Sequence, residues 1–170
     1  MANILPADEE FFQRIEREHI QVDPLLWNTI YQHIGDPVIV INLTVRYYLD
    51  NGEPIPQAEA SKILISIKHM VEIINKIHKP ESITLDEKDP LFCMIKEKGL
   101  KLDEVTDELF TQPIRNDLNI ISMNIGMHIY PSNKVRSIPI EDGRDILNHI
   151  RSIISFLDRL RIATSKKEAY

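Results

Sequence analysis

The sequence is poor in the residues that mark several large classes of protein. It contains one cysteine, Cys93, in 170 residues, which excludes an internal disulfide and a zinc site built from several cysteines. Cys93 lies in the apolar run LFCMI, so we expect a buried thiol rather than a nucleophile. Only five glycines are present. So few glycines argue against a turn-rich β fold, and the composition favours an all-α protein.

Basic residues are too few for a protein that binds nucleic acid through its phosphates. Lysine and arginine number 20 against 26 aspartates and glutamates, which gives a net charge of −6. A nucleic-acid-binding face needs an excess of basic side chains. We therefore expect no nucleic-acid partner.

Long apolar runs are also missing. No window reaches the roughly 18 apolar residues that a membrane-spanning helix requires. The N-terminal stretch MANILPADEEFFQRIEREH lacks the basic start and apolar core of a signal peptide. We therefore expect a cytoplasmic protein with no membrane contact. The apolar share of 43% and the charged share of 27% are typical of one globular domain, here residues 1–170.

Apolar residues at helical spacing are abundant. Asp23 followed by Pro24 predicts a helix start, because aspartate caps helices and proline suits their first position. Gly99 is a candidate for a helix C-cap. We expect helices over residues 7–19, 23–49, 57–78, 90–98, 102–110, 112–129 and 139–163.

One segment opposes this helical prediction. The run PVIVINLTV, residues 37–45, is rich in β-branched residues and by itself would be assigned to a strand. Pro37 is also unfavourable inside a helix, because it lacks an N–H and clashes with the preceding turn. A repeat overrides the strand assignment, and we expect a helix that is kinked at Pro37.

The repeat appears when the chain is compared with itself. The segment QHIGDPVIVINLTV, 32–45, aligns with QPIRNDLNIISMNI, 112–125, so that Gln32 matches Gln112 and Asp36 matches Asn116. With a slightly larger shift, the apolar positions of 63–77 align with those of 146–160. Two helical hairpins are therefore predicted, residues 23–79 and 112–163, joined by a helical linker, 80–111. Each hairpin alone leaves an apolar face bare, and pairing them as a four-helix bundle would bury it.

The opening of the second hairpin resembles a known family. The segment QPIRNDLNIISMNI is similar to the dimerisation and phosphotransfer helix of one class of sensor histidine kinases, which reads roughly HRVKNNLQIISSLL. Asp36 and Pro37 fall at the polar and proline positions of the commoner form of this motif. In that family a hairpin dimerises into a four-helix bundle. The resemblance implies that this chain is such a dimer fused into one polypeptide.

The sequence departs from the family at its reactive position. Gln32 and Gln112 stand where the phosphoacceptor histidine belongs. An amide nitrogen lacks the nucleophilic lone pair of a neutral imidazole, so phosphorylation at these positions is excluded. No glycine-rich phosphate loop is present either, so we expect no ATP-binding domain and no complete kinase. We also expect no cofactor.

The resemblance implies a non-catalytic regulator or scaffold that binds a receiver domain or a kinase of two-component signalling. Receiver domains dock beside and below the phosphohistidine in this family. The candidate partner-binding residues are therefore Gln32, Asp36, Gln112, Asn116 and Asn119. The alternative is that these are solvated polar residues at helix starts.

Three other functions remain open. Glu108, Gln112 and Asn116 are spaced by four residues, a layout that resembles the acid and amide of phosphatases that hydrolyse the aspartyl phosphate of receivers. His33 is a weaker candidate phosphoacceptor, since it lies one residue past the expected site and about 100° around a helix. A helical protein-binding module outside signalling is the third. No two histidines lie three or four residues apart, so we expect no metal site on a helix face.

Overall fold

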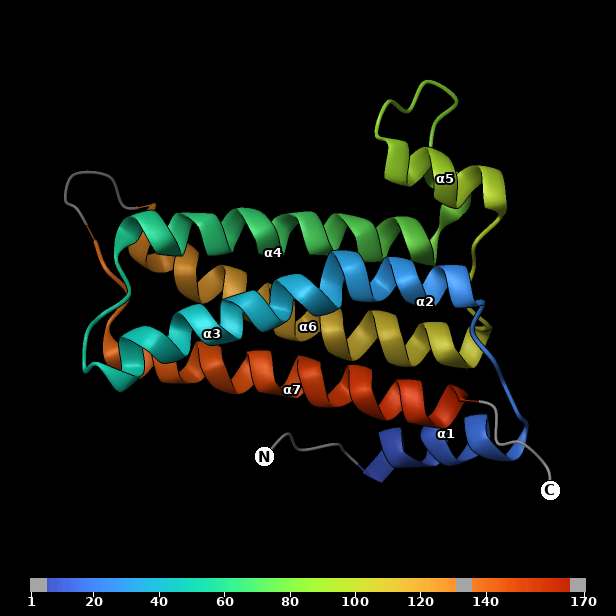
Figure 1. Ribbon diagram of the computed structural model, residues 1–170, viewed down its shortest axis with the longest axis horizontal. Helices are drawn as coiled ribbons and strands as arrows, with labels where there is room; N and C mark the ends of the chain where they lie inside the picture. Colours follow the sequence, from blue (N-terminus) through green and yellow to red (C-terminus); the bar gives the residue numbers. More distant parts are fainter. Residues whose placement is uncertain (1–5, 131–135, 166–170) are drawn as a thin grey trace.

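The computed structural model describes residues 6–130 and 136–165, and this part of the chain is all-α, as predicted (Figure 1). Its only β-type pairing is an isolated bridge between two loops. The elements are α1 (Pro6–Arg17), α2 (Pro24–Ile30), the π-helical segment η1 (Tyr31–Gly35), α3 (Asp36–Asp50), α4 (Gln57–His78), the 3₁₀ turn η2 (Pro80–Ser82), α5 (Pro90–Lys98), α6 (Glu104–Ile129) and α7 (Ile140–Thr164).

The first long helix forms because favourable caps and burial outweigh its β-branched residues. Asp23 Oδ1 accepts a hydrogen bond from the Leu25 backbone N–H at 2.8 Å, and Pro24 occupies the first turn, as predicted. Residues 37–45 are helical, so the strand assignment is correctly overridden. The helix accommodates Pro37 through η1, which lies directly before α3. A π turn is one of the few ways in which a helix absorbs a missing N–H, and the helix changes direction there (Figure 1).

The helix that opens the second hairpin starts earlier than predicted. The expected break at 111/112 is wrong, because α6 runs unbroken from Glu104 to Ile129 with Pro113 inside it. Asp103 caps it by accepting a hydrogen bond from the Val105 backbone N–H at 3.0 Å. Leu109 and Phe110 are buried together with Ile114. Burial on this shared face compensates for the hydrogen bond that Pro113 cannot make.

The other predicted helices are confirmed. The helix α4 begins directly after Pro56, and α7 begins directly after Pro139. The short helix α5 ends at Gly99, whose φ of 60° is the left-handed conformation expected of a C-cap glycine. Cys93 is half-buried rather than fully buried, and its thiol donates to the Glu87 carbonyl oxygen at 3.0 Å.

Four long helices, α3, α4, α6 and α7, lie side by side and enclose the core (Figure 1). The helix α6 packs against both α4 and α7, and α3 packs against α7. Lys68 Nζ on α4 donates to the Tyr130 hydroxyl at 2.7 Å, just past the end of α6. The helices α3 and α4, by contrast, do not pack along one another. The predicted packing of the two helices of the first hairpin against each other is therefore not confirmed, whereas α6 and α7 of the second do pack together.

The loops of the two hairpins are joined to each other. The Ile55 backbone N–H donates to the Ile138 carbonyl at 2.9 Å, and the Ile138 N–H donates to the Ile55 carbonyl at 2.8 Å. Both side chains are buried. Ile55 and Ile138 occupy matched positions of the repeat, since each precedes the proline that begins the returning helix, Pro56 or Pro139.

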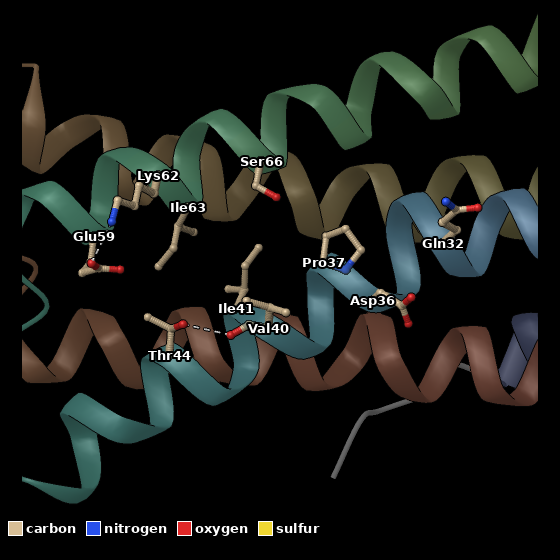
Figure 2. A pocket seen from close by; sticks show the side chains of 10 residues that line it. All are labelled: Gln32, Asp36, Pro37, Val40, Ile41, Thr44, Glu59, Lys62, Ile63 and Ser66. Atoms are coloured by element: carbon tan, nitrogen blue, oxygen red, sulfur yellow. Dashed lines mark hydrogen bonds and ion pairs between the residues drawn. The ribbon is translucent and has the colours of Figure 1, made fainter. Parts of the chain in front are cut away.

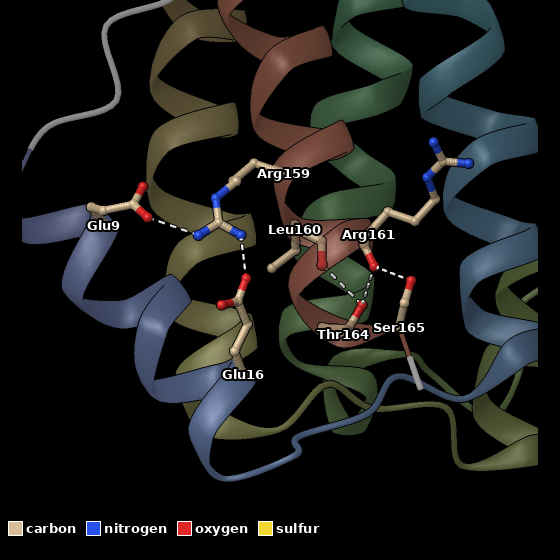
Figure 3. Close-up of polar contacts among 7 residues, drawn as sticks. All are labelled: Glu9, Glu16, Arg159, Leu160, Arg161, Thr164 and Ser165. Atoms are coloured by element: carbon tan, nitrogen blue, oxygen red, sulfur yellow. Dashed lines mark hydrogen bonds and ion pairs between the residues drawn. The ribbon is translucent and has the colours of Figure 1, made fainter. Parts of the chain in front are cut away.

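The short helix α1 covers one end of α7. Its buried residues Phe12 and Ile15 face the core. Arg159 on α7 binds two carboxylates of α1, with Nη2 2.7 Å from Glu9 Oε1 and Nη1 2.6 Å from Glu16 Oε1 (Figure 3). The Arg159 guanidinium also lies 4.9 Å from the centre of the Phe12 ring. These contacts attach α1 to the bundle by charge as well as by apolar burial.

Candidate functional site

The candidate residues of the second hairpin lie along α6. Glu108, Gln112, Asn116 and Asn119 are all exposed. Because α6 is continuous, Glu108, Gln112 and Asn116 follow one another at successive turns and share a side of the helix. Their side chains are free to meet a partner surface together.

The candidate residues of the first hairpin lie where α3 begins. Gln32, in η1, and Asp36, the first residue of α3, are exposed and lie at one end of a groove between α3 and α4 (Figure 2). His33 is half-buried and does not line this groove. The one-residue step thus directs His33 away from the side on which Gln32 lies.

The two sets of candidates do not form one site. The helix α4 packs against both η1 and α6, so the two sets flank it. Gln32 and Asp36 line the groove between α3 and α4, and no residue of α6 lines it. The structure therefore offers two candidate partner faces rather than a single pocket.

The groove between α3 and α4 encloses about 430 Å³ and is mainly apolar. Ile41 and Ile63 are its buried floor, and Val40 stands on its α3 wall (Figure 2). On its α4 rim, Lys62 Nζ and Glu59 Oε1 form an ion pair at 3.3 Å. The lysine side chain is 73% exposed, so this pair is screened by water and holds the rim only weakly.

In the second hairpin, two histidines join α6 to α7. His149 Nδ1 on α7 is 2.8 Å from Asp117 Oδ1 on α6, and His128 Nε2 on α6 is 2.6 Å from Asp142 Oδ2 on α7. In the alignment of the two repeats, Pro37 and Ser66 take the places of Asp117 and His149. A proline and a serine cannot reproduce the bridge.

The bridge between His149 and Asp117 is partly buried. Burial raises the pKa of the Asp117 carboxyl above its usual value, and the hydrogen bond and charge of His149 oppose this rise. A third pair, His78 Nδ1 and Asp107 Oδ2 at 2.6 Å, joins the end of α4 to the first turns of α6. These three histidines therefore hold helices together. Sequence reasoning missed the pairs, since their partners lie 14 to 32 residues away.

On the C-terminal side of each candidate set, the helix carries a stripe of exposed apolar side chains. On α3 these residues are Ile39, Val40, Leu43 and Tyr47, between 47% and 61% exposed. On α6 they are Ile120, Met123 and Met127, between 45% and 71% exposed. The repeat had aligned Val40 with Ile120 and Leu43 with Met123. It gave no sign that these matched pairs face solvent rather than the core.

The described residues give no sign of a metal site or a membrane span. No three histidine, cysteine, aspartate or glutamate side chains gather as metal ligands within residues 6–130 and 136–165. None of the helices in these ranges is both long and apolar enough to cross a bilayer.

The relationship of the chain to known proteins was tested in three ways. Comparison with models of protein families, with curated proteins and with solved structures found no match.

Proposed function

We propose that this protein is a non-catalytic regulator or scaffold, shaped like a fused dimer of the histidine-kinase dimerisation domain. It would act by binding a receiver domain or a kinase of two-component signalling. The proposal joins the resemblance of residues 112–125 with the exposure of both glutamines that replace the phosphoacceptor.

The reciprocal pairing of Ile55 with Ile138 is the observation that carries the proposal. In a symmetric dimer, residues on the two-fold axis meet their own copies. Here two residues at matched positions of the repeat exchange both backbone hydrogen bonds. The matched helix positions also share their environment. The buried set comprises Ile34, Val38, Ile41 and Val45 with Ile114, Leu118, Ile121 and Ile125. These features support a duplicated hairpin with a pseudo-two-fold axis.

The exposed faces suit a protein partner. Each begins with an amide side chain, Gln32 or Gln112. A short polar residue, Asp36 or Asn116, follows one helical turn later, and exposed apolar side chains follow toward the C-terminus of the helix. Contiguous exposed apolar residues beside polar ones are typical of protein–protein interfaces. By the family resemblance, this is the region on which a receiver would dock.

The test is binding to purified receiver domains and kinases encoded in the same genome, measured by titration calorimetry. We expect at least one to bind. Ile120→Glu should weaken that binding at least tenfold, since it places a charge in the apolar part of the α6 face. Glu72→Arg, an exposed change on α4, is the matched control. If no receiver or kinase binds, the signalling role is refuted, and a helical binding module outside signalling becomes the better proposal.

A second candidate function is dephosphorylation of a receiver. The observation in its favour is that α6 is continuous through Glu108, Gln112 and Asn116, all of them exposed. An amide can orient a water in line with the aspartyl phosphate, and an adjacent carboxylate can help to position or activate it.

The measurement is the decay rate of a phosphorylated receiver with and without this protein. We expect faster decay, lost in Gln112→Ala but kept in Gln32→Ala. Gln32 is the matched control because Asn28, not an acid, lies four residues before it. An unchanged half-life would exclude the phosphatase and leave the scaffold proposal untouched.

A further inference from the structure

The exposed side of α3 is unusually apolar for a helix on a protein surface. With Val38, Ile41 and Val45 buried on one side and Ile39, Val40, Leu43 and Tyr47 exposed on the other, α3 is apolar nearly all round. A helix of this kind is normally covered on every side. Here α7 covers only its inner side, and the open groove toward α4 leaves the rest bare.

We propose that this stripe of α3 binds the same stripe of a second copy of the chain, forming a homodimer in which the two α3 helices cross antiparallel. An interface around a two-fold axis must be self-complementary, since every contact between two residues occurs twice, once on each side of the axis. The α3 stripe has this property. Its central apolar residues, Ile39, Val40 and Leu43, lie between an acidic residue at one end, Asp36, and a basic residue at the other, Arg46.

The spacing of these residues fixes the register. Suppose that Val40 lies opposite Leu43 of the second copy. Asp36 precedes Val40 by four residues, and Tyr47 follows Leu43 by four. In an antiparallel pair of helices, Asp36 then lies beside Tyr47 and Arg46 of the second copy. Apolar contacts then fill the centre and an ion pair forms at each end. The groove beside α3, about 430 Å³, offers apolar space for side chains of the second copy.

The corresponding stripe of α6 does not fit this role. In the alignment of the two repeats, Asn116 replaces Asp36, Gly126 replaces Arg46 and Asn119 replaces Ile39. The α6 stripe thus has neither charge and one apolar side chain fewer. It also flanks a hairpin that two bridges between histidine and aspartate hold closed. Self-association is therefore specific to α3, and the α6 face stays free in the dimer.

The experiment is sedimentation velocity on the full chain over concentrations from about 1 to 500 μM, with circular dichroism to verify folding. The wild type should shift from monomer to dimer, and Leu43→Glu should remain monomeric. Met123→Glu makes the same change at the matched position of α6 and should dimerise like the wild type. Asp36→Arg should weaken dimerisation about tenfold, and the double swap Asp36→Arg with Arg46→Asp should restore it.

Three results would overturn the proposal. They are a wild type that is monomeric at every concentration, a dimer that Leu43→Glu leaves intact, and a double swap that associates no better than Asp36→Arg. The swap alters only exposed residues, so it tests the register even if Leu43→Glu fails to fold. The proposal does not depend on the signalling role, because no receiver or kinase enters the measurement.

Discussion

Charged side chains hold this protein together at points that are far apart in its sequence. Arg159 reaches across to Glu9 and Glu16, which precede it by 150 and 143 residues. The arginine side chain is 22% exposed, and the paired carboxylates raise its pKa despite the opposing effect of its burial. An arginine that serves two carboxylates and also lies over an aromatic ring has a fixed geometry, unlike an isolated surface pair.

Replacing Arg159 by methionine should destabilise the protein by about 1–2 kcal/mol, because Glu9 and Glu16 lose their partner while the apolar stem is kept. The measurement is urea unfolding at low and high salt, and the loss should shrink at high salt. Arg151→Met, an exposed change on the same helix, is the control and should cost less than 0.5 kcal/mol by the usual range for surface sites, about ±0.5 kcal/mol. Equal losses in the two variants would show that the two carboxylates contribute nothing specific.

Among the elements, the two hairpins differ more than their matched patterns suggest. In the second, two bridges between histidine and aspartate join α6 to α7. In the first, Pro37 interrupts the helix and faces Ser66 across an open groove (Figure 2). The α3–α4 pair, with Pro37 and Ser66 at the corresponding positions, leaves a groove between its helices, although the matched core positions of both pairs are buried.

Installing the missing bridge should close the first hairpin. The double variant Pro37→Asp with Ser66→His places in α3 and α4 the residues that join α6 to α7. We expect the two changes together to be more stabilising than the sum of the single changes, with a coupling of about 0.3–1 kcal/mol. A double-mutant cycle by urea unfolding measures it. A coupling of zero would mean that other contacts, and not the bridge, determine how close two helices of a hairpin lie.

At the scale of the whole molecule, the loops at one end of the bundle are joined through Ile55 and Ile138. Each residue is buried and each supplies one N–H and one carbonyl to the other. This contact connects the loop that follows α3 to the loop that precedes α7.

Ile55→Ala and Ile138→Ala should each cost about 2–5 kcal/mol, the usual range for truncating a buried isoleucine. The two losses should be similar because both side chains are buried and both residues make the same pair of backbone hydrogen bonds. The double variant should cost less than their sum, since the two truncations share one cavity. Thermal or urea unfolding of the three variants tests this. Additive or very unequal losses would contradict the symmetric role of the two residues.

The positions of most helices could be predicted from the sequence, because the signals are local. Asp23 with Pro24, Asp89 with Pro90, and Gly99 act on backbone groups within a few residues, so their effect does not depend on the rest of the fold. The start of α6 was mispredicted for a related reason. Pro113 locally disfavours a continuous helix, and burial of Leu109 and Phe110 in the core outweighs this.

The sequence by itself determined an all-α chain and the positions of most of its helices, since helical periodicity and capping residues are properties of the chain alone. Only the tertiary structure decided which of the matched apolar residues face solvent, which histidines meet aspartates, and that one hairpin stands open. Apolar spacing gives a helix an apolar side, but α3 and α6 are apolar on two sides. Which side is buried depends on where the neighbouring helices lie, and long-range contacts determine that position.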